Sequence, residues 1–169
     1  MAGSGIFFAV DRDTAERLKK TDMAERPFFI TKELDEVYFD EYPERTCELE
    51  DSWEAVHRAL TDGSFCFDCA DFPLGNAVLG GEVLYFDGKK YDDHIITLKT
   101  PEQAKSVFEG LAALDEKTFS KGYAKIPAEE YPDKSADDCE AAYEYLCDSV
   151  SFWRYAAEHG LYVLFTAEL

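Results

Sequence analysis

The chain has 169 residues, of which 46% are hydrophobic and 15% aromatic. This is enough apolar material for one packed domain spanning residues 1–169, and it argues against disorder. The 36 acidic residues exceed the 17 basic ones, which gives a net charge of −19. Because such a surface repels phosphate groups, we expect no nucleic-acid partner and no membrane partner. No apolar run approaches the roughly 18 residues that a membrane span requires.

The chain contains five cysteines, an odd number, and no basic region precedes its short N-terminal apolar stretch. Without a basic region that stretch does not resemble a signal peptide. An odd number of cysteines is most simply explained by reduced thiols, which are typical of the cytoplasm. We therefore expect a cytoplasmic protein with free thiols.

The first part of the chain predicts short elements. Asp11 or Asp13 is expected to cap the first helix, and Asp13 with Glu16 has the spacing of a capping box. Pro27 interrupts the chain, and the apolar residues after it predict a brief strand. The expected elements are a strand at 6–10, a helix at 11–20, a brief strand at 28–30 and a short helix at 32–42.

The middle of the chain predicts two helices on either side of a hairpin. A face of apolar residues marks the first helix, which Gly63 ends, and Thr100-Pro101 marks the start of the second. Asp87-Gly88 is a turn signal between two β runs. The expected elements are helices at 50–61 and 100–111, a helical turn at 73–78, strands at 83–86 and 94–98, and a short helix at 115–123.

The C-terminal stretch carries the strongest pattern. Apolar side chains recur at alternating spacings of four and three, which places them on one face of a single long helix. Ser135 is the expected N-cap, and Gly160 is expected to end the helix. Residues 161–167 follow as an uncharged β run, typical of a central strand covered on both faces. The apolar face consists of Cys139, Tyr143, Leu146, Val150, Trp153 and Ala157.

Together these elements predict an α+β fold in a single domain. Helices would pack on a mixed β-sheet, for which a three-layer α/β/α arrangement is one solution. The long C-terminal helix would be followed by a strand near the centre of that sheet.

Four segments also carry a family resemblance. They are Trp53, His57, Leu60 and Thr61 with acidic Glu50; Pro73, Leu74 and 77–81; Thr100-Pro101-Glu102-Gln103; and Phe152, Trp153, Ala156, Ala157, Gly160 and 163–165. In this order they resemble the YfbM-like (DUF1877) family of uncharacterised bacterial proteins over nearly the whole chain. The resemblance implies a single domain with mixed α and β structure, and it implies no activity. The chain departs from the family pattern in having Glu50 for Asp, Asp62 inserted before Gly63, and Trp153 for Tyr.

Glu50, Trp53 and His57 form the first candidate site. Their spacing would place an acid, an indole and an imidazole on one helical face, where His57 could act as a general base. The structural alternative is that Glu50 favours the helix N-terminus, Trp53 fills the core and His57 is a hydrogen-bonded interior histidine. Gly80 and Gly81 could bring backbone N–H groups to an anion, although a helix end followed by a strand also explains them.

Cys66 and Cys69 form a CxxC pair that could contribute to a zinc site or a redox site. The other plausible ligands are His57 and three further cysteines, Cys47, Cys139 and Cys147. Asp68 and Asp71 lie next to the pair in sequence and disfavour a thiolate. We therefore expect no metal and no cofactor.

Two classes of function remain. The first is a non-enzymatic protein-binding module whose acidic surface engages a basic protein, as an inhibitor or immunity-type protein does. The alternative is a small enzyme or ligand-binding domain with a pocket around Glu50, Trp53 and His57. The sequence has no nucleophile signature and no cofactor fingerprint, which favours the first class.

Overall fold

Five strands form one sheet in this computed structural model, which describes residues 3–86 and 94–169. The strand order is β2-β1-β5-β4-β3, and every neighbouring pair is antiparallel. The predicted α+β class and single domain are confirmed, but the sheet is antiparallel and not mixed. Strand direction depends on where each connection crosses the sheet, which the hydrophobic pattern of a strand does not encode. The strands are β1 (Gly5–Val10), β2 (Thr46–Glu50), β3 (Glu82–Tyr85), β4 (His94–Lys99) and β5 (Tyr162–Glu168).

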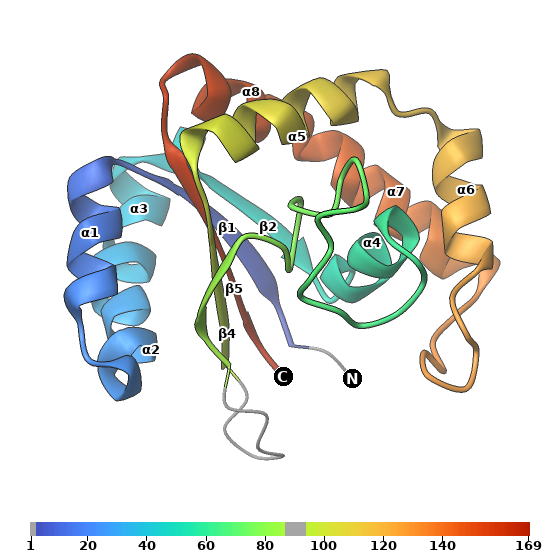
Figure 1. Cartoon of the computed structure of the whole chain (residues 1–169), viewed down its shortest axis with the longest axis horizontal. Coiled ribbons are helices and arrows are strands. Elements are labelled where there is room, and N and C mark those ends of the chain that lie inside the picture. The colour runs from blue at the N-terminus through green and yellow to red at the C-terminus, as the bar shows by residue number, and fades with distance from the viewer. Residues whose placement is uncertain (1–2, 87–93) are drawn as a thin grey trace.

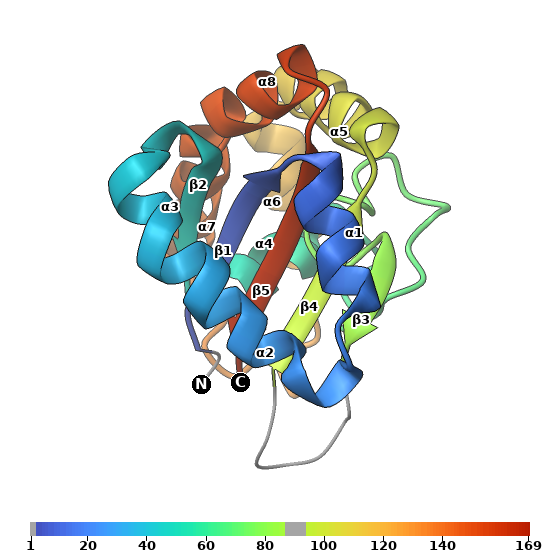
Figure 2. The same ribbon diagram turned by 90° about the vertical axis from the view of Figure 1, so that its left-hand side faces the viewer.

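Strand β5 lies at the centre of the sheet, as predicted, between β1 and β4. Val163, Phe165 and Ala167 face one hydrophobic core, whereas Leu164 belongs to a second core on the opposite face. A strand that is covered on both faces has a continuous apolar sequence, which explains why residues 162–167 of β5 carry no charge. Figure 2 shows helices on both sides of the sheet, so the fold has the three-layer α/β/α arrangement.

Helices α4 to α8 cover one face of the sheet (Figure 1). Helix α5 starts at Thr100-Pro101, as expected, and its N-terminus forms a capping box, in which Thr100 and Gln103 each accept a hydrogen bond from the other's backbone N–H. Asp115 caps α6 through the amide of Thr118. The bounds are α4 (Trp53–Leu60), α5 (Pro101–Ala113), α6 (Glu116–Ala124), α7 (Ala136–Asp148) and α8 (Val150–Glu158).

The opposite face is covered by α1 and by a run of helical turns from residue 26 to residue 41 (Figure 2). Ile30, Leu34 and Tyr38 are buried at intervals of four, which is a helical spacing. The strand predicted at 28–30 is therefore wrong, because this helical spacing begins within it. The bounds are α1 (Arg12–Lys20), η1 (Met23–Glu25), α2 (Arg26–Phe29), the π-helical segment η2 (Ile30–Asp35), α3 (Glu36–Glu41) and η3 (Pro43–Arg45).

Strand β2 occupies residues for which the sequence predicted no strand. Leu49 is its buried residue, and Glu50 ends it with a φ of 49°, in the left-handed region. Helix α4 begins only at Trp53. The helix predicted from residue 50 is thus too long at its N-terminal end, because a tight turn separates it from the strand.

The single long helix predicted before β5 is in fact two helices, α7 and α8, that meet at Ser149. Ser149 is completely buried, and its Oγ donates a hydrogen bond to the carbonyl of Leu146 at 2.6 Å. A hydroxyl bonded to the preceding turn often bends a helix. The apolar face nevertheless continues across the break, since Leu146 and Trp153 are both buried. The predicted ends are confirmed: Ser135 caps α7, and Gly160 has a φ of 61°.

The predicted hairpin is formed by β3 and β4, with Val83 opposite Thr97. Its turn signal, Asp87-Gly88, lies outside the described residues. Residues 73–78 form successive turns and not the predicted helical turn. Among the residues that the structure describes, no helix is both long and apolar enough to cross a membrane.

Candidate functional site

Trp53 and His57, two residues of the predicted site, lie on α4 with exposed fractions of 0% and 1%. Trp53 donates its Nε1–H to the carbonyl of Gly3 at 2.8 Å and packs against Phe165 of β5. The indole therefore ties the segment before β1 to α4, inside the core.

Glu50, the acid of the same predicted site, is exposed at the end of β2. It does not belong to α4, so the helical spacing that would have placed it above Trp53 does not apply. The structure accordingly does not bring Glu50, Trp53 and His57 onto one solvent-facing surface.

Gly80 and Gly81 lie where the chain enters β3, and both are required by close packing. Gly81 has a φ of 101°, and a Cβ at this position would lie 2.4 Å from the carbonyl oxygen of Leu98. A Cβ on Gly80 would lie 2.2 Å from the carbonyl oxygen of Gly75. The path of the backbone thus accounts for both glycines.

His57 meets the two cysteines of the CxxC pair in the irregular segment after α4. Its Nε2 lies 3.8 Å from Sγ of Cys66 and 3.7 Å from Sγ of Cys69, and the two sulfurs are 3.0 Å apart. The same Nε2 lies 2.7 Å from the carbonyl oxygen of Cys66, and the amide N–H of Leu79 points at Nδ1 from 3.5 Å. These two contacts assign the ring proton to Nε2, which donates to the carbonyl.

Burial determines the protonation of this cluster. It lowers the pKa of His57 to about 4, so the imidazole is neutral at neutral pH. Burial and the neighbouring Cys66 raise the pKa of Cys69 to about 12. The cluster therefore offers one neutral nitrogen and two sulfurs, the donor types that zinc prefers.

Lys99, on β4, is a completely buried amine whose charge interacts with Cys69. Its Nζ donates to Oγ1 of Thr97 at 2.5 Å and to the carbonyl of Val78. Across residues 3–86 and 94–169, no carboxylate forms an ion pair with it. Burial holds the pKa of Lys99 well below its usual value, while Cys69 acts in the opposite direction.

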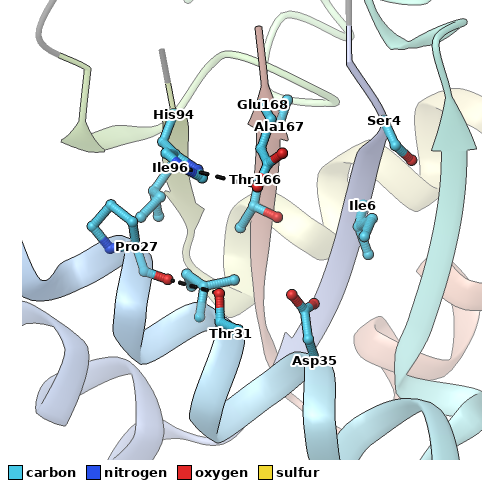
Figure 3. Close-up of a pocket in the computed structure, with 11 residues that line it drawn as sticks. Ser4, Ile6, Pro27, Thr31, Asp35, His94, Ile96, Thr166, Ala167 and Glu168 are labelled. Atoms are coloured by element: carbon cyan, nitrogen blue, oxygen red, sulfur yellow. Dashed lines mark hydrogen bonds and ion pairs between the residues drawn. The ribbon is translucent and has the colours of Figure 1, made fainter. Parts of the chain in front are cut away.

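A separate pocket of about 240 Å³ opens on the other face of the sheet (Figure 3). Asp35, at the end of η2, points into it from the helical layer. Its Oδ1 is buried and has no hydrogen-bond partner among residues 3–86 and 94–169. The other polar groups around it belong to Ser4, Thr31, His94, Thr166 and Glu168.

Negative charge dominates this pocket. Burial raises the pKa of Asp35, and the nearby carboxylates of Glu168 and Glu36 raise it further. Among the described residues that line the pocket, His94 alone has a basic side chain, and its Nε2 lies 3.8 Å from Oε1 of Glu168. The pocket therefore suits a cationic group better than an anionic one.

The sequence predicts these sites to different extents. It named His57 among the possible partners of Cys66 and Cys69, and the structure brings the three side chains together. It gave no signal for Asp35, because an acid near the end of a helical segment is ordinary. Nor did it indicate Lys99, since a lysine next to a helix start is normally solvated.

Comparison with known proteins identifies a family and a fold. The profile of the family described as "Domain of unknown function (DUF1877)" matches residues 1–166. The crystal structure of a protein of unknown function, YfbM from Escherichia coli, is similar with a TM-score of 0.70 at 20% sequence identity, over 99% of this chain and 100% of that chain. At this identity the structural similarity shows the fold alone. Among curated proteins, no relative matches this chain.

Proposed function

The chain belongs to the DUF1877 family, and from this starting point we propose that it is a non-enzymatic binding protein for a basic protein partner, of the inhibitor or immunity type. The observation that carries the proposal is the acidic pocket of Figure 3, where Asp35 presents a buried carboxylate oxygen that accepts no hydrogen bond from the described part of the chain. The net charge of −19 adds a long-range field of the same sign.

Among the described residues that line the pocket, only His94 has a basic side chain, and it lies next to Glu168 and not next to Asp35. Glu168 and Glu36 disfavour the charged form of Asp35, so these carboxylates repel one another when ionised. A lysine or arginine side chain from a partner would relieve that repulsion and give Asp35 a charge-assisted hydrogen bond. Binding would thus supply positive charge to carboxylates that the described part of the chain leaves without enough of it.

The test uses a labelled poly-arginine peptide as the probe and a poly-glutamate peptide as its counterpart. Stopped-flow fluorescence should show association with poly-arginine alone, with a rate that falls steeply as salt shortens the Debye length to about 8 Å. Asp35→Asn should weaken binding several-fold. His57→Ala should leave binding nearly unchanged, because His57 is buried away from the surface.

Glu109→Gln is the matched control, since it removes one charge from an exposed position on α5. It should weaken binding less than Asp35→Asn does. Equal losses in the two variants would mean that the peptide senses only net charge, and the assignment of the pocket would then be wrong.

A further inference from the structure

We propose that Cys66, Cys69 and His57 form a zinc site, with two Sγ atoms and Nε2 as ligands and a fourth position left open. This inference concerns the opposite face of the sheet from the acidic pocket, and it is independent of the proposed binding function. It departs from the expectation of no metal drawn from the sequence, because the structure supplies the third ligand in place.

The separations of the donor atoms carry the proposal. Tetrahedral zinc with bonds of about 2.3 Å to sulfur and 2.0–2.1 Å to nitrogen holds each sulfur roughly 3.6 Å from the nitrogen and the two sulfurs roughly 3.8 Å apart. The two S···N distances are 3.7 and 3.8 Å, close to this geometry. The S···S distance of 3.0 Å must lengthen, and the partly exposed side chain of Cys66 can turn to allow it.

The same cluster is less suited to a dithiol switch. Attack on a disulfide needs a thiolate, and the pKa of Cys69 is raised to about 12. Zinc provides the missing positive charge itself and displaces the thiol protons to solvent as it binds.

Zinc binding requires the ring proton of His57 to move from one nitrogen to the other. The metal takes the lone pair of Nε2, so the ring proton moves to Nδ1 and the hydrogen bond to the carbonyl of Cys66 is given up. Nδ1 is only loosely engaged, because the amide nitrogen of Leu79 lies 3.5 Å away. Three metal–ligand bonds thus replace the hydrogen bonds that Nε2 and Sγ of Cys69 donate to the carbonyl of Cys66, the contact between the two thiols and the weak bond from the amide of Leu79.

A bound zinc ion would anchor the chain around it, and its open fourth position would be taken by water or by a ligand from outside the cluster. Residues 61–81 contain no helix or strand, and His57 belongs to the rigid helix α4 before them. Zinc would fasten this irregular segment to α4 at Cys66 and Cys69. The packing there is already tight, since a Cβ on Gly75 would lie 1.8 Å from the carbonyl oxygen of Cys69. Of the three ligands only Cys66 is partly exposed, so the open fourth position faces its side of the cluster.

The test is titration of the reduced, chelator-treated full chain with Co²⁺ as a spectroscopic substitute for zinc. We expect one Co²⁺ per chain, with a thiolate-to-cobalt charge-transfer band in the near ultraviolet and strong visible bands of tetrahedral coordination. Added Zn²⁺ should erase these bands. Zinc loading should also slow hydrogen exchange in the amides of residues 64–81.

The variants separate this site from the many surface carboxylates. Cys66→Ser and Cys69→Ser should each reduce the charge-transfer intensity by about half or more, with native far-ultraviolet circular dichroism as the check on folding. Cys147→Ser, which alters an exposed thiol on α7, should leave the spectrum unchanged.

Two outcomes would overturn the proposal. One is Co²⁺ binding with only the weak bands of octahedral oxygen coordination, which would assign it to carboxylates. The other is a reduced protein without any charge-transfer band that forms a Cys66–Cys69 disulfide on exposure to oxidised glutathione, which would make the pair a redox dithiol.

Discussion

At the scale of single residues, Asp35 is a side chain that we expect to lower the stability of the folded protein at neutral pH. Its pKa is raised from 3.8, so the native state holds this proton more tightly than the unfolded state does. Stability must then fall as pH rises from about 3.8 through the native pKa, and it stays lower above that value. Asp35→Asn should raise the free energy of unfolding at pH 7 by roughly 0.5 kcal/mol, and the gain should vanish below about pH 3.8.

Urea titrations at several pH values measure this effect. Asp40→Asn on α3 is the matched control, because it makes the same change at an exposed position of the same helical layer. An Asp35→Asn protein that is less stable than wild type at pH 7 would show that the carboxylate has a favourable partner.

Lys99 is a buried base, and its shifted pKa likewise predicts how stability depends on pH. Its pKa is lowered, so at pH values below 10.5 the unfolded chain binds a proton that the native state binds less tightly. Lys99 therefore reduces stability at neutral pH, and this penalty disappears as pH rises towards 10.5. Lys99→Met should stabilise the protein at pH 7 by about 1 kcal/mol or more, because a buried charge is replaced by an apolar chain of similar length.

The carbonyl of Val78 keeps its bond from Thr97 at 3.0 Å in this variant, so no acceptor is orphaned. Thermal unfolding at pH 7 and pH 10 gives the measurement, with Lys105→Met on the exposed side of α5 as the control. A loss of stability at both pH values would mean that the hydrogen bonds of the amine outweigh its desolvation.

At the scale of elements, α8 is fixed to the sheet by Trp153. Its ring is completely buried and meets Phe7 of β1 edge-on, with the ring centres 5.2 Å apart. Trp153→Ala should lower the free energy of unfolding by about 3–5 kcal/mol through the cavity it leaves. Glu158→Ala, at an exposed position of the same helix, should change it little. A urea midpoint for Trp153→Ala within error of wild type would refute this account of the packing.

The elements also show which parts of a fold a single sequence predicts. The caps at Thr100, Asp115 and Ser135 and the helix end at Gly160 were predictable, because each depends on residues within one turn. The break at Ser149 was not, since it depends on burying a hydroxyl that could equally have faced water. Strand β2 was missed because only Leu49 of its residues is buried, which leaves too little periodicity to detect.

In the candidate sites, too, only features that depend on residues close together in sequence were predictable. Residues close in sequence could be grouped in advance, as Cys66 and Cys69 were. Contacts such as those of Lys99 with Val78, or of Asp35 with Glu168, depend on strand order and register. Those are properties of the assembled sheet, and they have no local signature in the chain.

At the scale of the whole molecule, the excess of 36 acids over 17 bases opposes compaction. Salt screens that repulsion, so added KCl should raise the melting temperature between low ionic strength and about 0.5 M, where most of the long-range field is screened. Repeating the melts in glycerol at constant ionic strength separates screening from a general solvent effect. A melting temperature that falls with KCl would indicate that local ion pairs, such as Arg58 with Glu54, contribute more than the net charge does.

The pairing of Gly5 with Ala167 makes the assembly of the sheet a late event in folding. Its central hydrogen bonds join the two ends of the chain, so nearly the entire polypeptide must be gathered before they form. Until then β1 and β4 each present an open edge, the kind of surface at which strands of different molecules pair. A chain cut after Gly160 would retain every helix and lose only β5, yet we expect it in the insoluble fraction on expression, while the full chain stays in solution. By pairing with β1 and β4, the last strand covers both of these edges and so prevents them from pairing with other molecules.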